Sequence, residues 1–152
     1  MMSLFSGFNI SASGLTANRM RMDVVSSNIA NANTTRAQIV NGEWVPYRRK
    51  SVELSQGGVS PFEQQLQSMM NKESGQVSGV KVSGIKEDHS PFTLTYDPTH
   101  SEADANGYVR SPNVDPIKEM VDLMSATRSY EANVTALNAS KNMFMKALEI
   151  GK

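Results

Sequence analysis

Residues 115–150, DPIKEMVDLMSATRSYEANVTALNASKNMFMKALEI, form the most regular stretch of the sequence. Asp115 is a favourable helix N-cap, and Pro116 suits the first helical position because its missing N–H needs no partner there. Residues 117–150 contain neither proline nor glycine, and Gly151 supplies a stop signal. We therefore expect a single helix of about 35 residues, roughly 50 Å long.

This predicted helix carries a heptad pattern. Its stripe, spaced alternately by three and four residues, consists of Met120, Leu123, Thr127, Tyr130, Val134, Leu137, Lys141, Phe144 and Leu148. A seam held over four heptads is typical of a coiled coil. An amphipathic helix packed on its own domain remains the alternative, although a helix of this length extends beyond the core that so small a chain can build. Thr127 and Lys141 weaken the seam, which argues against a plain dimeric zipper.

The N-terminal segment has a similar but poorer stripe. Its positions are Leu4, Phe8, Ser11, Leu15, Asn18, Met22, Val25, Ile29 and Ala32. Gly7 and Gly14 each cost roughly 1 kcal/mol relative to alanine inside a helix, so this helix should need a partner. The two stripes share one period, and we expect them to pair and leave apolar surface for neighbouring molecules. The candidate interface residues are Leu15, Met22, Val25, Ile29, Met120, Leu123, Tyr130, Val134, Leu137, Phe144 and Leu148.

Most prolines and glycines lie between Gly42 and Pro112, which predicts a turn-rich middle. Short strands are expected at residues 77–85, at residues 92–96 and near residues 44–47, where Pro46 implies an edge or a strand end. Residues 62–72 fit a short helix or a polar loop, and we favour the loop. The predicted fold class is α+β, with an N-terminal helix in 1–35, a β-rich middle in 36–114 and a C-terminal coiled-coil helix in 115–152.

Composition narrows the possible functions. The 152 residues suit one domain, and 15 basic residues balance 15 acidic ones. Because no basic face is evident, nucleic acid is not an expected partner, and the run 48–50 (Arg-Arg-Lys) is interpreted as a solvated strand end. The absence of cysteine excludes disulfides and thiolate metal sites. The N-terminus lacks the features of a secretory signal, and no stretch approaches 18 apolar residues.

No catalytic constellation is visible. His89 and His100 lie near acidic residues but lack the spacing of metal ligands, so solvated loop residues are the preferred interpretation. Asn28, Asn31 and Asn33 fit helix capping and chain reversal better than a ligand site. We expect no enzymatic activity, no cofactor, no metal and no small-molecule substrate.

Several stretches resemble the flagellar rod and hook proteins. They are Ser13-Gly14-Leu15-Thr16-Ala17, Asn28-Ile29-Ala30-Asn31-Ala32-Asn33-Thr34-Thr35, Pro46-Tyr47-Arg48-Arg49-Lys50, Tyr96-Asp97-Pro98-Thr99-His100, Gly107-Tyr108-Val109, Ser111-Pro112-Asn113-Val114, Tyr130-Glu131-Ala132-Asn133-Val134 and Leu137-Asn138. Together they are most similar to proximal-rod proteins of the FlgC type. Residues 37–44 depart from the family's pattern, which leaves the local shape of that loop open.

The resemblance implies a structural subunit of the bacterial flagellar basal-body rod, needed for motility. It implies export through the flagellar export apparatus without a cleaved signal, and a place in the basal body outside the cytoplasmic membrane. It also implies a rod in which the terminal helices form the inner layer and the middle segment lies outside. The implied partners are other rod proteins, copies of the chain itself, and the membrane-ring and export-gate components.

Two alternatives remain at this point. A hook or distal-rod paralogue would share the N-terminal signature, although such relatives are usually longer. A small enzyme or soluble peptide-binding adaptor belongs to a different class and should be a compact monomer with both termini ordered.

Overall fold

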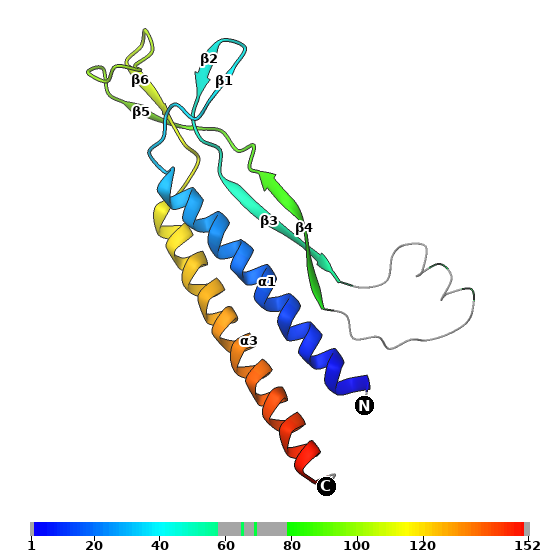
Figure 1. Ribbon diagram of the computed structural model, residues 1–152. Coiled ribbons are helices and arrows are strands. Elements are labelled where there is room, and N and C mark those ends of the chain that lie inside the picture. The colour runs from blue at the N-terminus through cyan, green and yellow to red at the C-terminus, as the bar shows by residue number, and fades with distance from the viewer. Residues whose placement is uncertain (1, 58–64, 66–68, 70–78, 151–152) are drawn as a thin grey trace. The chain divides into compact units, whose positions relative to one another are not determined.

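The computed structural model describes residues 2–57, 65, 69 and 79–150. Within them the chain has two long helices and a small middle part made of three two-stranded sheets (Figure 1). The elements are α1 (Met2–Ala30), β1 (Gln38–Val40), β2 (Glu43–Val45), β3 (Lys50–Gln56), β4 (Val80–Glu87), β5 (Thr93–Tyr96), β6 (Tyr108–Ser111) and α3 (Pro116–Ile150). The predicted combination of terminal helices with a β-containing middle is confirmed.

The long C-terminal helix begins as the sequence predicts. The Asp115 carboxylate accepts hydrogen bonds from the backbone N–H groups of Ile117 and Lys118, at 3.0 and 3.3 Å. These are two of the donors that a helix leaves unpaired at its start, so Asp115 is the N-cap. α1 ends at Ala30, and a hydrogen bond from the Thr34 N–H to the Asn31 carbonyl, 3.1 Å long, closes the turn that follows.

The hairpin of β1 and β2 is built around the dipeptide Asn41-Gly42. Both residues have positive φ, 54° and 88°, as a two-residue type I′ turn requires. The strands are antiparallel, with Ile39 opposite Trp44. The predicted strand near residues 44–47 is confirmed as β2, which ends before Pro46; its partner β1 was not predicted.

The second hairpin joins β5 to β6. These antiparallel strands pair Tyr96 with Tyr108, whose rings meet edge to face with centroids 5.3 Å apart. β5 confirms the strand predicted at 92–96, and β4 confirms the later part of the one predicted at 77–85. β3 and β6 were not predicted. Most of the segment 62–72, for which a loop was favoured, lies outside the described residues.

The chain divides into two compact units. Unit 1 comprises Met1–Arg19, Leu54–Ser83 and Thr127–Lys152, and unit 2 comprises Met20–Glu53 and Gly84–Ala126. Each unit therefore contains a segment of α1 and a segment of α3. The buried apolar side chains in unit 2 include those of Val24, Val25, Tyr47, Val109 and Ala126. In the described part of the chain, neither helix has a window long and apolar enough to cross a membrane.

Candidate assembly interface

Asn28 is the centre of a buried polar network in unit 2. Its side chain is fully buried, and its amide group makes four hydrogen bonds. The nitrogen donates to the Lys50 carbonyl and to the Glu119 carboxylate, both at 2.8 Å. The oxygen accepts from the Lys50 N–H at 2.9 Å and from the Tyr47 hydroxyl at 3.0 Å. All four positions of the amide are used, so this residue joins α1 to both β3 and α3.

Glu119 brings a carboxylate into the same network. It is 0% exposed, and its second oxygen accepts a 2.6 Å hydrogen bond from the Nε of Arg49. The Arg49 guanidinium also reaches Asp122, at 3.5 Å. A buried carboxylate is tolerated only when it is paired and hydrogen-bonded. Asn28 and Arg49 together satisfy that condition, and they fix the position of α3 against α1 and the start of β3 within unit 2.

The extended chain that follows Pro46 positions the Tyr47 and Arg49 side chains of this network. Alternate residues of an extended chain face the same side, so Tyr47 and Arg49 both reach the network. Arg48 faces the other way, with its guanidinium 4.5 Å from the ring centroid of Phe92. The Arg49 N–H donates to the Asn113 side chain at 2.8 Å. This hydrogen bond holds the residues just before β3 against the segment before α3.

Two predictions about single residues were wrong. The basic run was interpreted as a solvated strand end, but the Arg49 side chain is only 22% exposed because Glu119 pairs with it. Asn28 was assigned to helix capping, but it is a buried cross-link between elements. The interpretation holds for Asn31, whose amide donates to the Ser27 carbonyl at 2.9 Å in the last turn of α1.

In unit 1 the helices approach closely at Gly14. A Cβ atom on this glycine would lie 3.0 Å from the Asn133 Oδ1 atom and 3.1 Å from its Nδ2 atom. Ser13, next to it, accepts a 3.1 Å hydrogen bond from the N–H of Val80 and so ties α1 to the start of β4. Gly79 is needed beside it because a Cβ there would meet the Ser13 hydroxyl at 2.3 Å.

The residues predicted for the interface differ in their burial. Val25 is buried, whereas Met120 and Leu148 are exposed. The others are half-buried: Leu15, Met22, Ile29, Leu123, Tyr130, Val134, Leu137 and Phe144. The single chain therefore covers most of the predicted stripe only in part.

Five of the buried positions on the helices lie outside the predicted stripe. They are Ala17, Val24, Asn28, Glu119 and Ala126. On α3, Glu119 and Ala126 belong to a series spaced by seven residues that continues through Asn133 and Ser140. A search for large apolar residues passes over small and polar side chains, which all of these positions except Val24 carry. On α3 the seven-residue spacing of Glu119, Ala126, Asn133 and Ser140 is a signal that could have found the buried positions, because small residues permit close approach of helices.

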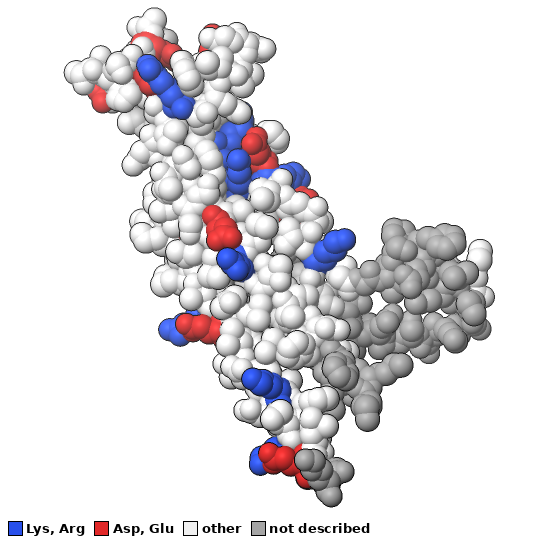
Figure 2. Space-filling model, viewed as in Figure 1, with Lys and Arg blue, Asp and Glu red and all other residues white. Residues whose placement is uncertain are grey.

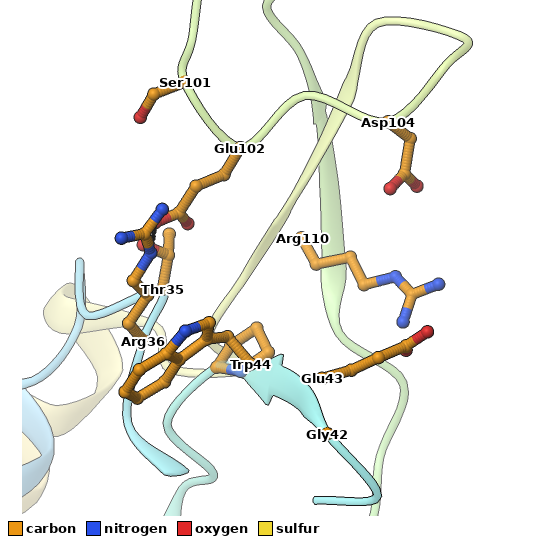
Figure 3. A pocket seen from close by; sticks show the side chains of 10 residues that line it. Thr35, Arg36, Gly42, Glu43, Trp44, Ser101, Glu102, Asp104 and Arg110 are labelled. Carbon is orange, nitrogen blue, oxygen red and sulfur yellow. Dashed lines mark ion pairs between the residues drawn. The ribbon is translucent and has the colours of Figure 1, made fainter. Parts of the chain in front are cut away.

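Unit 2 also has an open pocket of about 400 Å³ beside the β1–β2 hairpin (Figure 3). Its lining mixes both signs of charge and includes an ion pair between Arg36 and Glu102. A hydrogen bond from the Thr35 side chain, followed by the Arg36 charge, lowers the pKa of Glu102 below its usual value. Among the described residues no cluster of three His, Cys, Asp or Glu side chains could hold a metal ion. Acidic and basic side chains are also interspersed across the face seen in Figure 2.

Comparisons with known proteins match both ends of the chain. A family model described as "Flagella basal body rod protein" matches residues 8–38, and one described as "Flagellar basal body rod FlgEFG protein C-terminal" matches residues 105–150. The flagellar basal-body rod protein FlgC of Bacillus subtilis is 64% identical over 151 residues, covering 99% of this chain and 100% of the relative. FlgC of Borreliella burgdorferi is 43% identical over 98% of both chains. FlgC of Salmonella typhimurium is 39% identical over 99% of this chain and 100% of the relative.

Proposed function

Because the chain belongs to the family of FlgC flagellar basal-body rod proteins and is a structural subunit of that rod, we propose that it assembles through its two terminal helices. α1 and α3 pair as a coiled coil in the inner layer, while residues 36–114 lie outside. The protein is structural and is not an enzyme. The observation that carries the assembly mechanism is the incomplete burial of the seam within one chain.

The side chains of the seam explain why neighbours are needed. Tyr130, Val134, Leu137 and Phe144 remain half-buried although α1 lies beside α3 in unit 1. Burying apolar surface contributes about 25 cal/mol per Å². When neighbouring subunits cover the remaining apolar area, each copy in the assembly gains this free energy. Such packing also stabilises long helices whose intrinsic stability is modest.

A rod subunit assembles with other rod components. We further propose that its neighbours include copies of the chain itself and the membrane-ring and export-gate components. The flagellar export apparatus delivers it outside the cytoplasmic membrane without cleavage of a signal peptide. This localisation is supported by the names of the relatives, which place them in the basal body.

The experiment that tests this function is deletion of the gene followed by complementation. Basal bodies purified from the deletion strain should retain the membrane rings and lack the rod with everything beyond it, and the cells should not swim. An affinity-tagged copy should restore swimming and copurify with the basal bodies. Complete flagella in the deletion strain would refute the proposed function.

A further inference from the structure

The chain contains two Asn-Gly steps, and the structure gives them different surroundings. One is Asn41-Gly42 at the tip of the β1–β2 hairpin, and the other is Asn106-Gly107 just before β6. Both glycines have positive φ, 88° and 79°. An asparagine followed by glycine is chemically reactive, because glycine has no side chain to hinder attack by its backbone nitrogen on the asparagine amide.

The Asn41-Gly42 step is open on all sides. Both residues are exposed, and a Cβ atom added to Gly42 would meet nothing within 4 Å. In the part of the chain that the structure describes, the Gly42 N–H donates none of the turn hydrogen bonds. β1 and β2 have three residues each and form a sheet of their own. A short two-stranded hairpin is marginally stable, so its tip opens at little cost in free energy.

The Asn106-Gly107 step is held closed by its neighbours. The Gly107 N–H donates to the Asp104 carbonyl at 2.7 Å, and the Gly107 carbonyl accepts from the Asp97 N–H at 3.0 Å. A Cβ atom on Gly107 would lie 3.0 Å from a ring carbon of Tyr96. The nitrogen that would attack the Asn106 side chain is therefore already hydrogen-bonded, and the backbone around it is packed against an aromatic ring.

We propose that Asn41 is a site of spontaneous deamidation and that the fold protects Asn106 from the same reaction. The Gly42 backbone nitrogen attacks Cγ of Asn41 and forms a new C–N bond. The bond between Cγ and Nδ2 breaks, and ammonia leaves with the proton from the Gly42 nitrogen. Water then adds to either carbonyl of the cyclic succinimide and opens the ring, which gives aspartate or isoaspartate. Water is the only co-reactant, and nothing is oxidised or reduced.

Ring closure starts from the opened hairpin tip. In the type I′ turn, Asn41 has a left-handed backbone conformation, with φ of 54°. This conformation turns the Gly42 nitrogen away from the Asn41 side chain, so the closed turn does not react. The rate of deamidation therefore follows the population of the opened tip. The same reasoning makes Asn106 slow, because two backbone hydrogen bonds must break before its turn opens.

Both products change the hairpin. Either one places a new negative charge next to Glu43 in the sequence. Isoaspartate also adds a carbon atom to the main chain of a turn that has only two residues, which disturbs the register that sets Ile39 opposite Trp44. Gly42 and Trp44 line the pocket shown in Figure 3, so the reaction alters the wall of that pocket.

The test is peptide mapping of the purified full chain during incubation in mildly alkaline buffer. Tryptic cleavage after Arg36 and Arg48 releases residues 37–48, and cleavage after Lys86 and Arg110 releases residues 87–110. Each peptide contains a single asparagine, so each reports one Asn-Gly step. Liquid chromatography with mass spectrometry separates the aspartate and isoaspartate forms from the unchanged peptide. A parallel incubation in urea removes the effect of the fold.

In the folded protein we expect peptide 37–48 to deamidate at least about tenfold faster than peptide 87–110, because the Gly107 hydrogen bonds must break first. In urea the two peptides should deamidate at similar rates. Equal rates in the folded protein, or a faster reaction in peptide 87–110, would overturn the inference. A difference that persists unchanged in urea would also overturn it, because local sequence rather than the fold would then explain the selectivity.

Discussion

At the scale of single residues, Asn28 has the most exacting environment in unit 2. Its amide pairs with Glu119, which is 91 positions away in the sequence. The residues near Asn28 in the sequence do not indicate this partner. Assigning an asparagine to helix capping or chain reversal depends only on its near neighbours. Arg49 was misjudged for the same reason. A basic side chain in a basic run is expected to be exposed to solvent. Only the fold shows that a distant residue, Glu119, brings a carboxylate to Arg49.

The near-isosteric change Asn28→Asp tests this network. It places a second carboxylate beside the Glu119 oxygen that Asn28 now contacts at 2.8 Å. Two adjacent buried carboxylates resist ionisation together, so the pKa of the pair in the folded state rises above its unfolded value. Stability is then retained at low pH and lost as pH rises through the raised pKa. We expect a loss of about 3 kcal/mol at pH 7 relative to wild type, with a smaller loss near pH 5.

Urea unfolding followed by circular dichroism at both pH values measures this effect. Asn31→Asp is the matched control because the Asn31 side chain makes only an exposed hydrogen bond to the Ser27 carbonyl in the last turn of α1. It should cost less than about 1 kcal/mol at either pH, from the charge near the C-terminus of the helix. An Asn28→Asp loss that is the same at pH 5 and pH 7 would contradict the described network.

At the scale of elements, those that depend on local features of the sequence could be predicted, whereas those held in place by distant segments could not. α3 was predicted with its N-cap because capping and a continuous run without proline are local features. β1 was not predicted, although Asn41-Gly42 is a strong signal for a β-hairpin. β3 offers little signal, since most of its residues are exposed and few are apolar. Its position depends instead on contacts with distant segments, such as the hydrogen bonds between Lys50 and Asn28.

The two glycines of α1 give a matched test of the helix contact in unit 1. A Cβ on Gly7 meets nothing within 4 Å, whereas one on Gly14 meets the Asn133 side chain. Gly7→Ala should therefore stabilise the protein by about 1 kcal/mol through helix propensity. Gly14→Ala should give no such gain, and the Asn133→Ala background should restore it.

Urea unfolding of the single and double variants measures this coupling as a double-mutant cycle. The account requires a measurable interaction between Gly14→Ala and Asn133→Ala, and none between Gly7→Ala and Asn133→Ala. Equal gains from the two glycine replacements in the wild-type background would show that the helices do not approach at Gly14.

At the scale of the whole molecule, function was accessible from the sequence mainly through resemblance. Stretches at both ends indicated the flagellar rod family, and relatives that align over almost the whole chain establish it. Periodicity alone predicted two helices with apolar stripes. It did not predict the burial of Glu119 on α3, because that burial depends on Arg49 supplying a partner for the carboxylate. The seam residues remain a predicted assembly interface.

The central claim is that this seam joins subunits into the rod, and a charge placed on it tests that claim most directly. Leu137 is half-buried on the seam, whereas Lys141, the next seam position, is exposed. Leu137→Asp introduces a carboxylate that becomes buried and unpaired in every assembled copy, at a cost of several kcal/mol each. Lys141→Asp replaces a residue that is already charged and exposed, so it serves as the control.

The measurement is the yield of complete basal bodies by electron microscopy, together with swimming in soft agar, from cells that make either variant at wild-type levels. The account predicts that Leu137→Asp leaves the protein present in cells but gives no rods, no filaments and no swimming. Lys141→Asp should retain most assembly. Equal defects from the two variants, or normal rods with Leu137→Asp, would contradict assembly through this seam.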